Sequence, residues 1–103
     1  MIRGTTPSFI FNVEVPEDEI SKIEVTFKQE NTGAEVKKVY ETNSPDFENG
    51  ELNVSLSRED SELFSVGICK VQLRIQTKDN RILASDINKI KVEPALSTTV
   101  IGG

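Results

Sequence analysis

A chain of 103 residues has the length of one domain, and its hydrophobic fraction of 36% is too high for general disorder. Its net charge of −5 argues against nucleic acid or an anionic membrane as a partner. The single cysteine, Cys69, lies in an alternating apolar run and has no internal partner, which predicts a buried thiol and synthesis inside the cell.

Alternating apolar residues predict two strands in the first third of the chain. Phe9, Phe11 and Val13 recur with a period of two, which is typical of a strand with one buried face. Residues 17–19 are acidic and favour a helical turn. A second strand follows, in which residues 23, 25 and 27 are apolar and their neighbours polar.

The middle of the chain has a weaker pattern, and residues 32–48 fit a regular sandwich least well. Residues 35–41 have a spacing that fits a helical turn or an irregular strand, and we choose the strand. Lys37 and Lys38 there suit a sheet edge, where charged side chains discourage pairing with other chains. Asn49 and Gly50 both tolerate positive φ, which predicts a tight hairpin.

The second half shows the clearest alternation. After a strand at residues 52–56, Ser57 is placed to cap a short helical turn over residues 58–64, with Asp60 as its partner. Residues 69–75 alternate most regularly and predict a central strand. The last strand changes the parity of its apolar residues, which predicts a bulge near Asn88 and Lys89.

These elements predict an all-β fold, an antiparallel immunoglobulin-like β-sandwich of about seven strands with one short helical turn. We expect the sandwich domain to span residues 1–94 and residues 95–103 to form a flexible C-terminal tail. No run of about 20 apolar residues is present, so no membrane span and no exported leader are expected.

Catalytic residues are not evident in this sequence. It contains no histidine and one cysteine, which excludes the common zinc sites and all histidine-based acids and bases. Acidic residues cluster at 17–19 and at Asp46, Glu48 and Glu51, but neither cluster has the spacing of a calcium loop. We expect no enzyme activity, no cofactor and no metal, and interpret both clusters as solvated surface.

Charge is unevenly distributed along the chain. Residues 1–65 carry six basic and fourteen acidic side chains, whereas residues 66–92 carry six and two. If Lys70, Arg74, Lys89 and Lys91 share one sheet face, that face could bind an acidic partner. The alternative is that cross-strand neighbours such as Glu24 neutralise them.

The C-terminal tail also has two interpretations. It is uncharged, and its apolar residues Val100 and Ile101 could dock on a neighbouring sheet edge. It could equally be a frayed terminus. We include Val100 and Ile101 with the four basic residues as candidate partner-binding residues.

Several segments together resemble a family of small phage and prophage proteins. These are Leu-Ser-Arg-Glu-Asp-Ser-Glu-Leu-Phe at 56–64, Val-Gln-Leu-Arg-Ile-Gln-Thr at 71–77, Leu-Ala-Ser-Asp-Ile at 83–87 and the opening Met-Ile-Arg-Gly-Thr-Thr-Pro at 1–7. The layout is also similar to the immunoglobulin-like N-terminal domain of phage baseplate upper proteins. The resemblance covers nearly the whole chain, but its motifs are structural.

The resemblance implies a virion structural protein of Gram-positive hosts, made in the bacterial cytoplasm and associated with the tail or baseplate. The expected function is a non-enzymatic assembly module that contacts other phage structural proteins or copies of itself. One rival is a carbohydrate or cell-surface binding module, although sugar sites usually offer exposed aromatic rings and this chain has no tryptophan. A hydrolase with paired carboxylates is a second rival, which the missing histidine and the small size make improbable.

Overall fold

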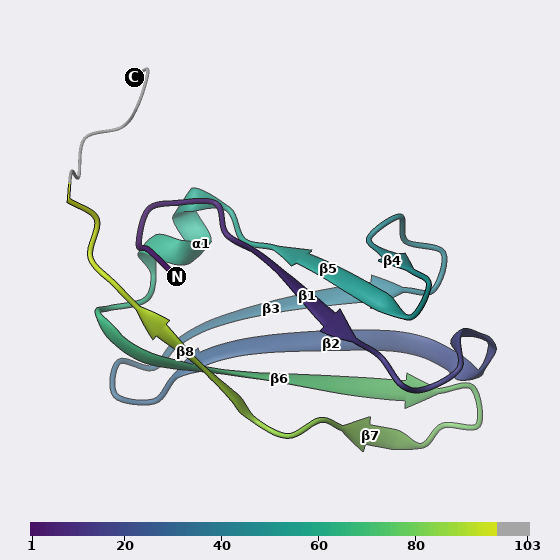
Figure 1. Ribbon diagram of the computed structural model, residues 1–103. Helices are drawn as coiled ribbons and strands as arrows, with labels where there is room; N and C mark the ends of the chain where they lie inside the picture. The colour runs from purple at the N-terminus through teal and green to yellow at the C-terminus, as the bar shows by residue number, and fades with distance from the viewer. Residues whose placement is uncertain (97–103) are drawn as a thin grey trace.

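A computed structural model of the protein describes residues 1–96, which form two antiparallel sheets packed face to face (Figure 1). Each sheet buries one side of its strands, as the alternating pattern predicts. Within these residues the elements are β1 (Ser8–Asn12), η1 (a 3-10 helix, Glu17–Glu19), β2 (Ile20–Gln29), β3 (Ala34–Glu41), β4 (Phe47–Glu48), β5 (Glu51–Ser55), α1 (Arg58–Glu62), β6 (Gly67–Thr77), β7 (Ile82–Ala84) and β8 (Asn88–Val92).

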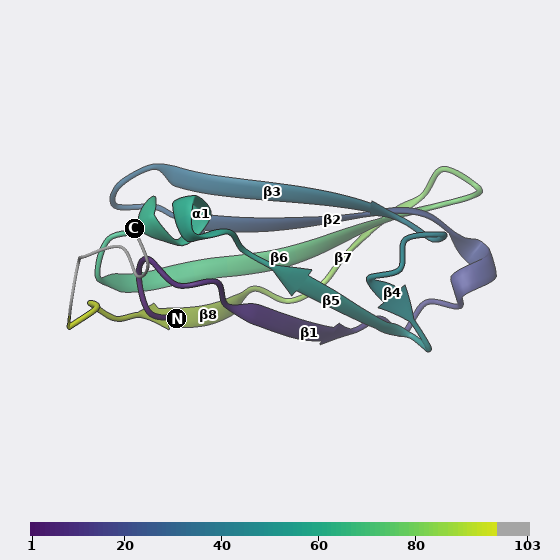
Figure 2. The same ribbon diagram turned by 90° about the horizontal axis from the view of Figure 1, so that it is seen from above.

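The strand order is that of an immunoglobulin-like sandwich. One sheet has the order β1-β5-β4, and the other has the order β3-β2-β6, with β7 and β8 both paired to β6. These orders correspond to strands B-E-D and C′-C-F-G of the immunoglobulin fold. Seen from above, β1 and β3 lie at opposite margins of the molecule (Figure 2). The predicted all-β sandwich is therefore confirmed, with β6 as its central strand.

The core lies between the sheets and is built from residues of one parity. Ile23, Val25 and Phe27 of β2 are fully buried, and the register aligns Phe27 with Val71 on β6. From the opposite sheet, Phe9 brings its ring centroid to 5.6 Å from that of Phe27. This contact joins the two layers at their centre.

The uncertain middle segment forms strand β3 and a tight turn. Residues 34–41 pair with β2 along their whole length, and β3 is the edge of its sheet, so the strand and the edge predicted at Lys37 and Lys38 are both confirmed. Asn49 and Gly50 have φ values of 53° and 76°, which allow the tight turn between β4 and β5.

The irregularity in the last strand lies earlier than predicted. β7 and β8 form two parts of one strand beside β6, and the register shifts between them, so that Asp86 and Ile87 lie opposite the single residue Gln72. The Ser85 hydroxyl accepts the Leu73 amide at 3.0 Å and replaces a backbone bond there. The bulge predicted near Asn88 and Lys89 is thus present but lies just before Asn88, because the Ser85 hydroxyl ends regular pairing before the apolar parity changes.

The short helix α1 begins with the predicted capping box. The Ser57 hydroxyl accepts the Asp60 amide at 3.0 Å, and the Asp60 carboxylate accepts the Ser57 amide at 3.1 Å. The same carboxylate accepts a bond of 2.8 Å from the Lys38 ammonium on β3. Asp60 therefore caps the helix and also ties it to the edge strand.

Replacing Asp60 by asparagine should make stability less sensitive to acid. The bond from Lys38, and then those from Ser57, lower the pKa of Asp60 below its ordinary value of 3.8. A depressed folded-state pKa contributes stability above the unfolded-state value, and this is lost as the pH falls through the folded-state value. We expect Asp60→Asn to cost about 0.5–1 kcal/mol at neutral pH, on the scale of a lost cap.

Urea unfolding followed by circular dichroism, at about pH 7 and about pH 3, measures this difference between the two proteins. The gap between wild type and Asp60→Asn should shrink at the lower pH. An equal gap at both values would show that the charge of Asp60 makes no contribution.

The N-terminal residues run beside the end of β8. Ile2 and Glu93 form a parallel bridge, in which the Arg3 amide donates to the Glu93 carbonyl at 3.0 Å and the Glu93 amide donates to the Met1 carbonyl at 2.8 Å. The Arg3 guanidinium also donates to the carbonyl of Glu62, the last residue of α1, at 3.0 Å. The start of the chain is thereby fixed to two other segments.

Candidate interaction surface on the outer sheet face

The largest continuous surface of strands is the outer face of the five-stranded sheet, the side turned away from β1, β5 and β4. Alternation and register place the outward residues of each strand on this face. Its cations are Lys22, Lys28, Lys37, Lys70, Arg74, Lys89 and Lys91. Three carboxylates lie at outward positions on the same face, namely Glu24, Glu35 and Glu41. The seven cations and three carboxylates give this face a net charge of +4. Since the whole chain has a net charge of −5, the other residues carry −9.

All four basic residues singled out from the sequence lie on this outer face. Lys70 and Arg74 project from β6, and Lys89 and Lys91 project from β8, with Lys70 directly opposite Lys89. The other two candidate residues, Val100 and Ile101, lie outside the described residues.

Three lysines form a row across neighbouring strands at one end of this face. Lys28 on β2 lies opposite Lys70 on β6, which lies opposite Lys89 on β8. Like charges in directly opposed positions destabilise a sheet, by up to about 1 kcal/mol per pair. Glu30, just beyond β2, offsets part of this repulsion with a bond of 3.0 Å to the Lys70 ammonium. Sequence analysis missed Lys28 because only the register between strands brings it to the row.

Several other cations on the face have acidic neighbours. The distance between the Arg74 guanidinium and the Glu24 carboxylate is 3.7 Å, and that between the Lys91 ammonium and the Glu93 carboxylate is 3.8 Å. The cross-strand neutralisation expected from Glu24 is therefore present at Arg74. Such solvent-exposed pairs contribute little to the free energy of folding, typically about 0–1 kcal/mol. Their cations can therefore exchange these carboxylates for those of another protein surface at small cost.

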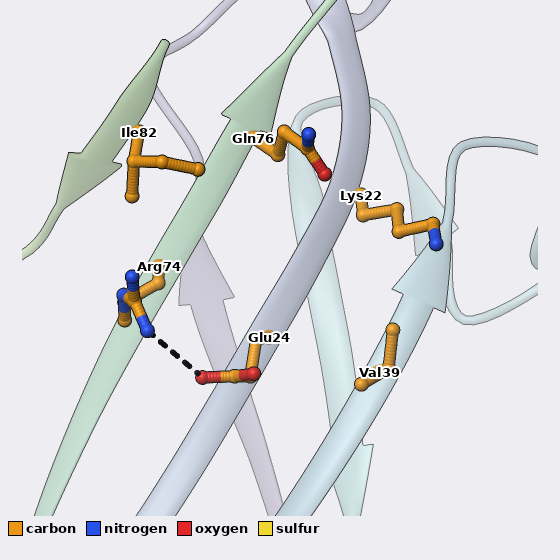
Figure 3. A pocket seen from close by; sticks show the side chains of 6 residues that line it. All are labelled: Lys22, Glu24, Val39, Arg74, Gln76 and Ile82. Carbon is orange, nitrogen blue, oxygen red and sulfur yellow. Dashed lines mark ion pairs between the residues drawn. The ribbon is translucent and has the colours of Figure 1, made fainter. Parts of the chain in front are cut away.

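A shallow depression of about 280 Å³ lies at the other end of the face (Figure 3). The ion pair of Arg74 and Glu24 lines its middle, and the exposed apolar side chains Ile82 and Val39 stand on its two sides. Lys22 and Gln76 complete its lining. The depression combines one ion pair with apolar walls, a composition that suits a contact with another protein surface.

Metal-binding side chains do not cluster in the part of the chain that the structure describes, and the single cysteine there is buried. Among residues 1–96, no three side chains of the acidic, cysteine or histidine types come together as metal ligands. The Cys69 thiol is fully buried, as predicted, and desolvation raises its pKa to about 11, so it is protonated and unreactive at neutral pH. No helix within these residues is long and apolar enough to span a bilayer.

Aromatic side chains are absent from the exposed surface of the described residues. Five phenylalanines and Tyr40 are buried or half-buried, and the rings face the space between the sheets. Burial also raises the pKa of Tyr40, with a smaller contribution from the charge of Asp46. A sugar ring would therefore find no exposed ring to stack on in this part of the chain.

Comparison with known proteins returned no match for this chain among family models, curated proteins or solved structures.

Proposed function

We propose that this chain is a non-enzymatic structural module of a phage or prophage particle, associated with the tail or baseplate, and that it binds an acidic protein surface through its outer sheet face. The observation that carries the docking face is the row Lys28, Lys70 and Lys89. A row of opposed like charges costs stability in the isolated domain, and a partner's carboxylates would remove that cost on binding. The assignment to a particle is supported by the sequence resemblance described above.

The partner is inferred to be a folded acidic surface rather than a nucleic acid. The outer face of the five-stranded sheet carries a net +4, while the remaining residues carry a net −9. A long polyanion would be repelled by most of the molecule, whereas a discrete acidic patch can meet the lysine row alone. Glu30 and Glu93 lie just beyond the ends of β2 and β8, beside Lys70 and Lys91. Their negative charges would repel a partner's carboxylates there and so fix the position of the contact.

A carbohydrate or cell-surface binding module remains the second candidate, because the depression beside Arg74 holds polar groups that could bind hydroxyls. The six aromatic side chains speak against it, because each of them is buried or half-buried and none is exposed for stacking on a sugar. A glycan array probed with the labelled protein distinguishes the two, since the assembly module should give no signal above background.

The particle assignment predicts that this chain co-purifies with virions. A lysogen that carries the gene would be induced, the particles purified on a density gradient, and their proteins quantified by mass spectrometry. We expect the chain in the particle fraction. Its absence from intact particles, despite expression in the cell, would overturn the structural role.

The lysine row should be needed for this incorporation. We expect Lys70→Glu combined with Lys89→Glu to lower the amount of chain per particle at least about tenfold, because reversed charges face the same acidic surface. Lys78→Glu combined with Arg81→Glu is the matched control, since it changes the net charge equally at the exposed turn after β6. Equal incorporation of both variants would reject the outer face as the docking site.

A further inference from the structure

Strand β1 leaves one edge of its sheet open. β1 pairs with β5 on one side only, and no described segment takes the place of strand A of the immunoglobulin fold on the other side. Figure 2 shows β1 at the margin of its layer. An unpaired edge of this kind is a template for a further strand.

Hydrogen bonding decides which backbone groups this edge presents. The Leu56 amide donates to the Pro7 carbonyl at 3.0 Å, and the Val13 amide donates to the Gly50 carbonyl at 2.8 Å. Antiparallel pairing alternates, so the odd-numbered residues of β1 bond to β5. The N–H and C=O groups of Ser8, Ile10 and Asn12 consequently point away from β5, in the plane of the sheet, toward the open edge.

The side chains of β1 include no charged residue that would discourage pairing at this edge. β3, the edge strand of the other sheet, carries four charged residues among eight, whereas β1 carries none. Charged side chains are a usual protection of exposed edges. Ile10 is instead 66% exposed at the centre of β1, and Phe9 and Phe11 are only half-buried.

We propose that two copies of this chain pair through β1, antiparallel and about a two-fold axis at Ile10. In this register Ile10 lies opposite Ile10 of the second copy, and Ser8 lies opposite Asn12 of the second copy. All three outward residues then form hydrogen-bonded pairs, and the two three-stranded sheets become continuous. Glu14 falls opposite Thr6 of the second copy, so no like charges meet.

This pairing deepens the proposed assembly function, and rests on it, by naming one edge and one partner. It uses a surface different from the outer face of the five-stranded sheet. A β1-linked dimer would therefore present two copies of the lysine row to the assembly. Two weak contacts with acidic surfaces, once linked in this way, bind more tightly than either does alone.

The test uses light scattering and sedimentation over a concentration series of the full chain. We expect a mass that rises to twice that of the single chain, and an Ile10→Lys variant whose dissociation constant is at least about tenfold higher. Val39→Lys is the matched control, because Val39 is a similarly exposed aliphatic residue, 60% accessible, on the outer face. It should dimerise as the wild type does.

The register is tested by cross-linking, in a background where Cys69 is replaced by serine. Hydrogen-bonded antiparallel pairs have Cα atoms about 5.5 Å apart, within the range of a disulfide. Ile10→Cys should therefore form a cross-linked dimer under mild oxidation, and Val39→Cys should not. Equal cross-linking at both positions would overturn the pairing.

A monomer at every concentration, or a dimer unaffected by Ile10→Lys, would overturn the β1 pairing while leaving incorporation into particles intact. A chain that dimerises through Ile10 but is absent from particles would overturn the proposed function alone.

Discussion

Replacing Phe27 by alanine should lower the free energy of unfolding by about 3–5 kcal/mol. Phe27 is fully buried in the second half of β2, and its ring meets that of Phe9 from the opposite sheet. Its register neighbours, Val36 and Val71, stand on rigidly paired strands and cannot fill the space that the ring leaves. Since a domain of this size has a total stability of about 5–15 kcal/mol, the variant should lose a large part of it.

Urea unfolding followed by far-ultraviolet circular dichroism measures this loss, because the chain has no tryptophan to report by fluorescence. Val39→Ala is the control, since Val39 is mostly exposed on β3 and its truncation should change stability by less than about 0.5 kcal/mol. Similar losses for the two variants would contradict the placement of Phe27 in the shared core.

Replacing Gln29 by leucine should cost about 2–4 kcal/mol, because it removes the partners of two part-buried hydrogen bonds to the Ser65 backbone. The Gln29 amide is fully buried, and it donates to the Ser65 carbonyl at 2.8 Å and accepts the Ser65 amide at 2.8 Å. The Thr32 hydroxyl also donates to the Gln29 amide oxygen at 3.0 Å. The side chain thus acts as a backbone substitute that holds the loop between α1 and β6 against the end of β2.

Gln76→Leu provides the matched control, since Gln76 is a half-exposed glutamine that lines the outer depression. It should be nearly neutral in the same urea experiment. Hydrogen exchange adds a local measurement, in which the Ser65 amide should lose protection in Gln29→Leu and keep it in Gln76→Leu. Unchanged protection at Ser65 would contradict the bridging role.

Alternation in the sequence was sufficient to predict most of this fold. Period-two patterns identified the buried faces of β1, β2 and β6, because a strand between water and core must alternate. Local turn chemistry identified the capping box at Ser57 and the hairpin at Asn49, since both depend on residues a few positions apart. The same local signals could not locate the bulge at Asp86 and Ile87, which depends on a bond from Ser85 to another strand.

Features that depend on contacts between strands could not be predicted in this way. Gln29 continues the inward parity of Phe27, but a polar residue is not recognised as core until its partner Ser65 is known. The lysine row combines β2, β6 and β8, and its register depends on pairing between Lys28 and Lys70, which are 42 positions apart in the sequence. The sequence pattern raised a shared face for Lys70 and Lys89 only as a condition, and the register of β6 and β8 was needed to pair them, as it was to bring Lys28 to the row.

The parallel bridge between Ile2 and Glu93 has a mechanical consequence for a protein built into a larger assembly. The two segments run in the same direction, so a force that draws the N-terminus and the end of β8 apart acts along the segments and across their hydrogen bonds, as a shear. Bonds loaded along the strands in this way must break together, whereas an antiparallel hairpin pulled at its open end breaks one bond at a time. Tension applied to the first residues and to the end of β8 would thus load this bridge in shear.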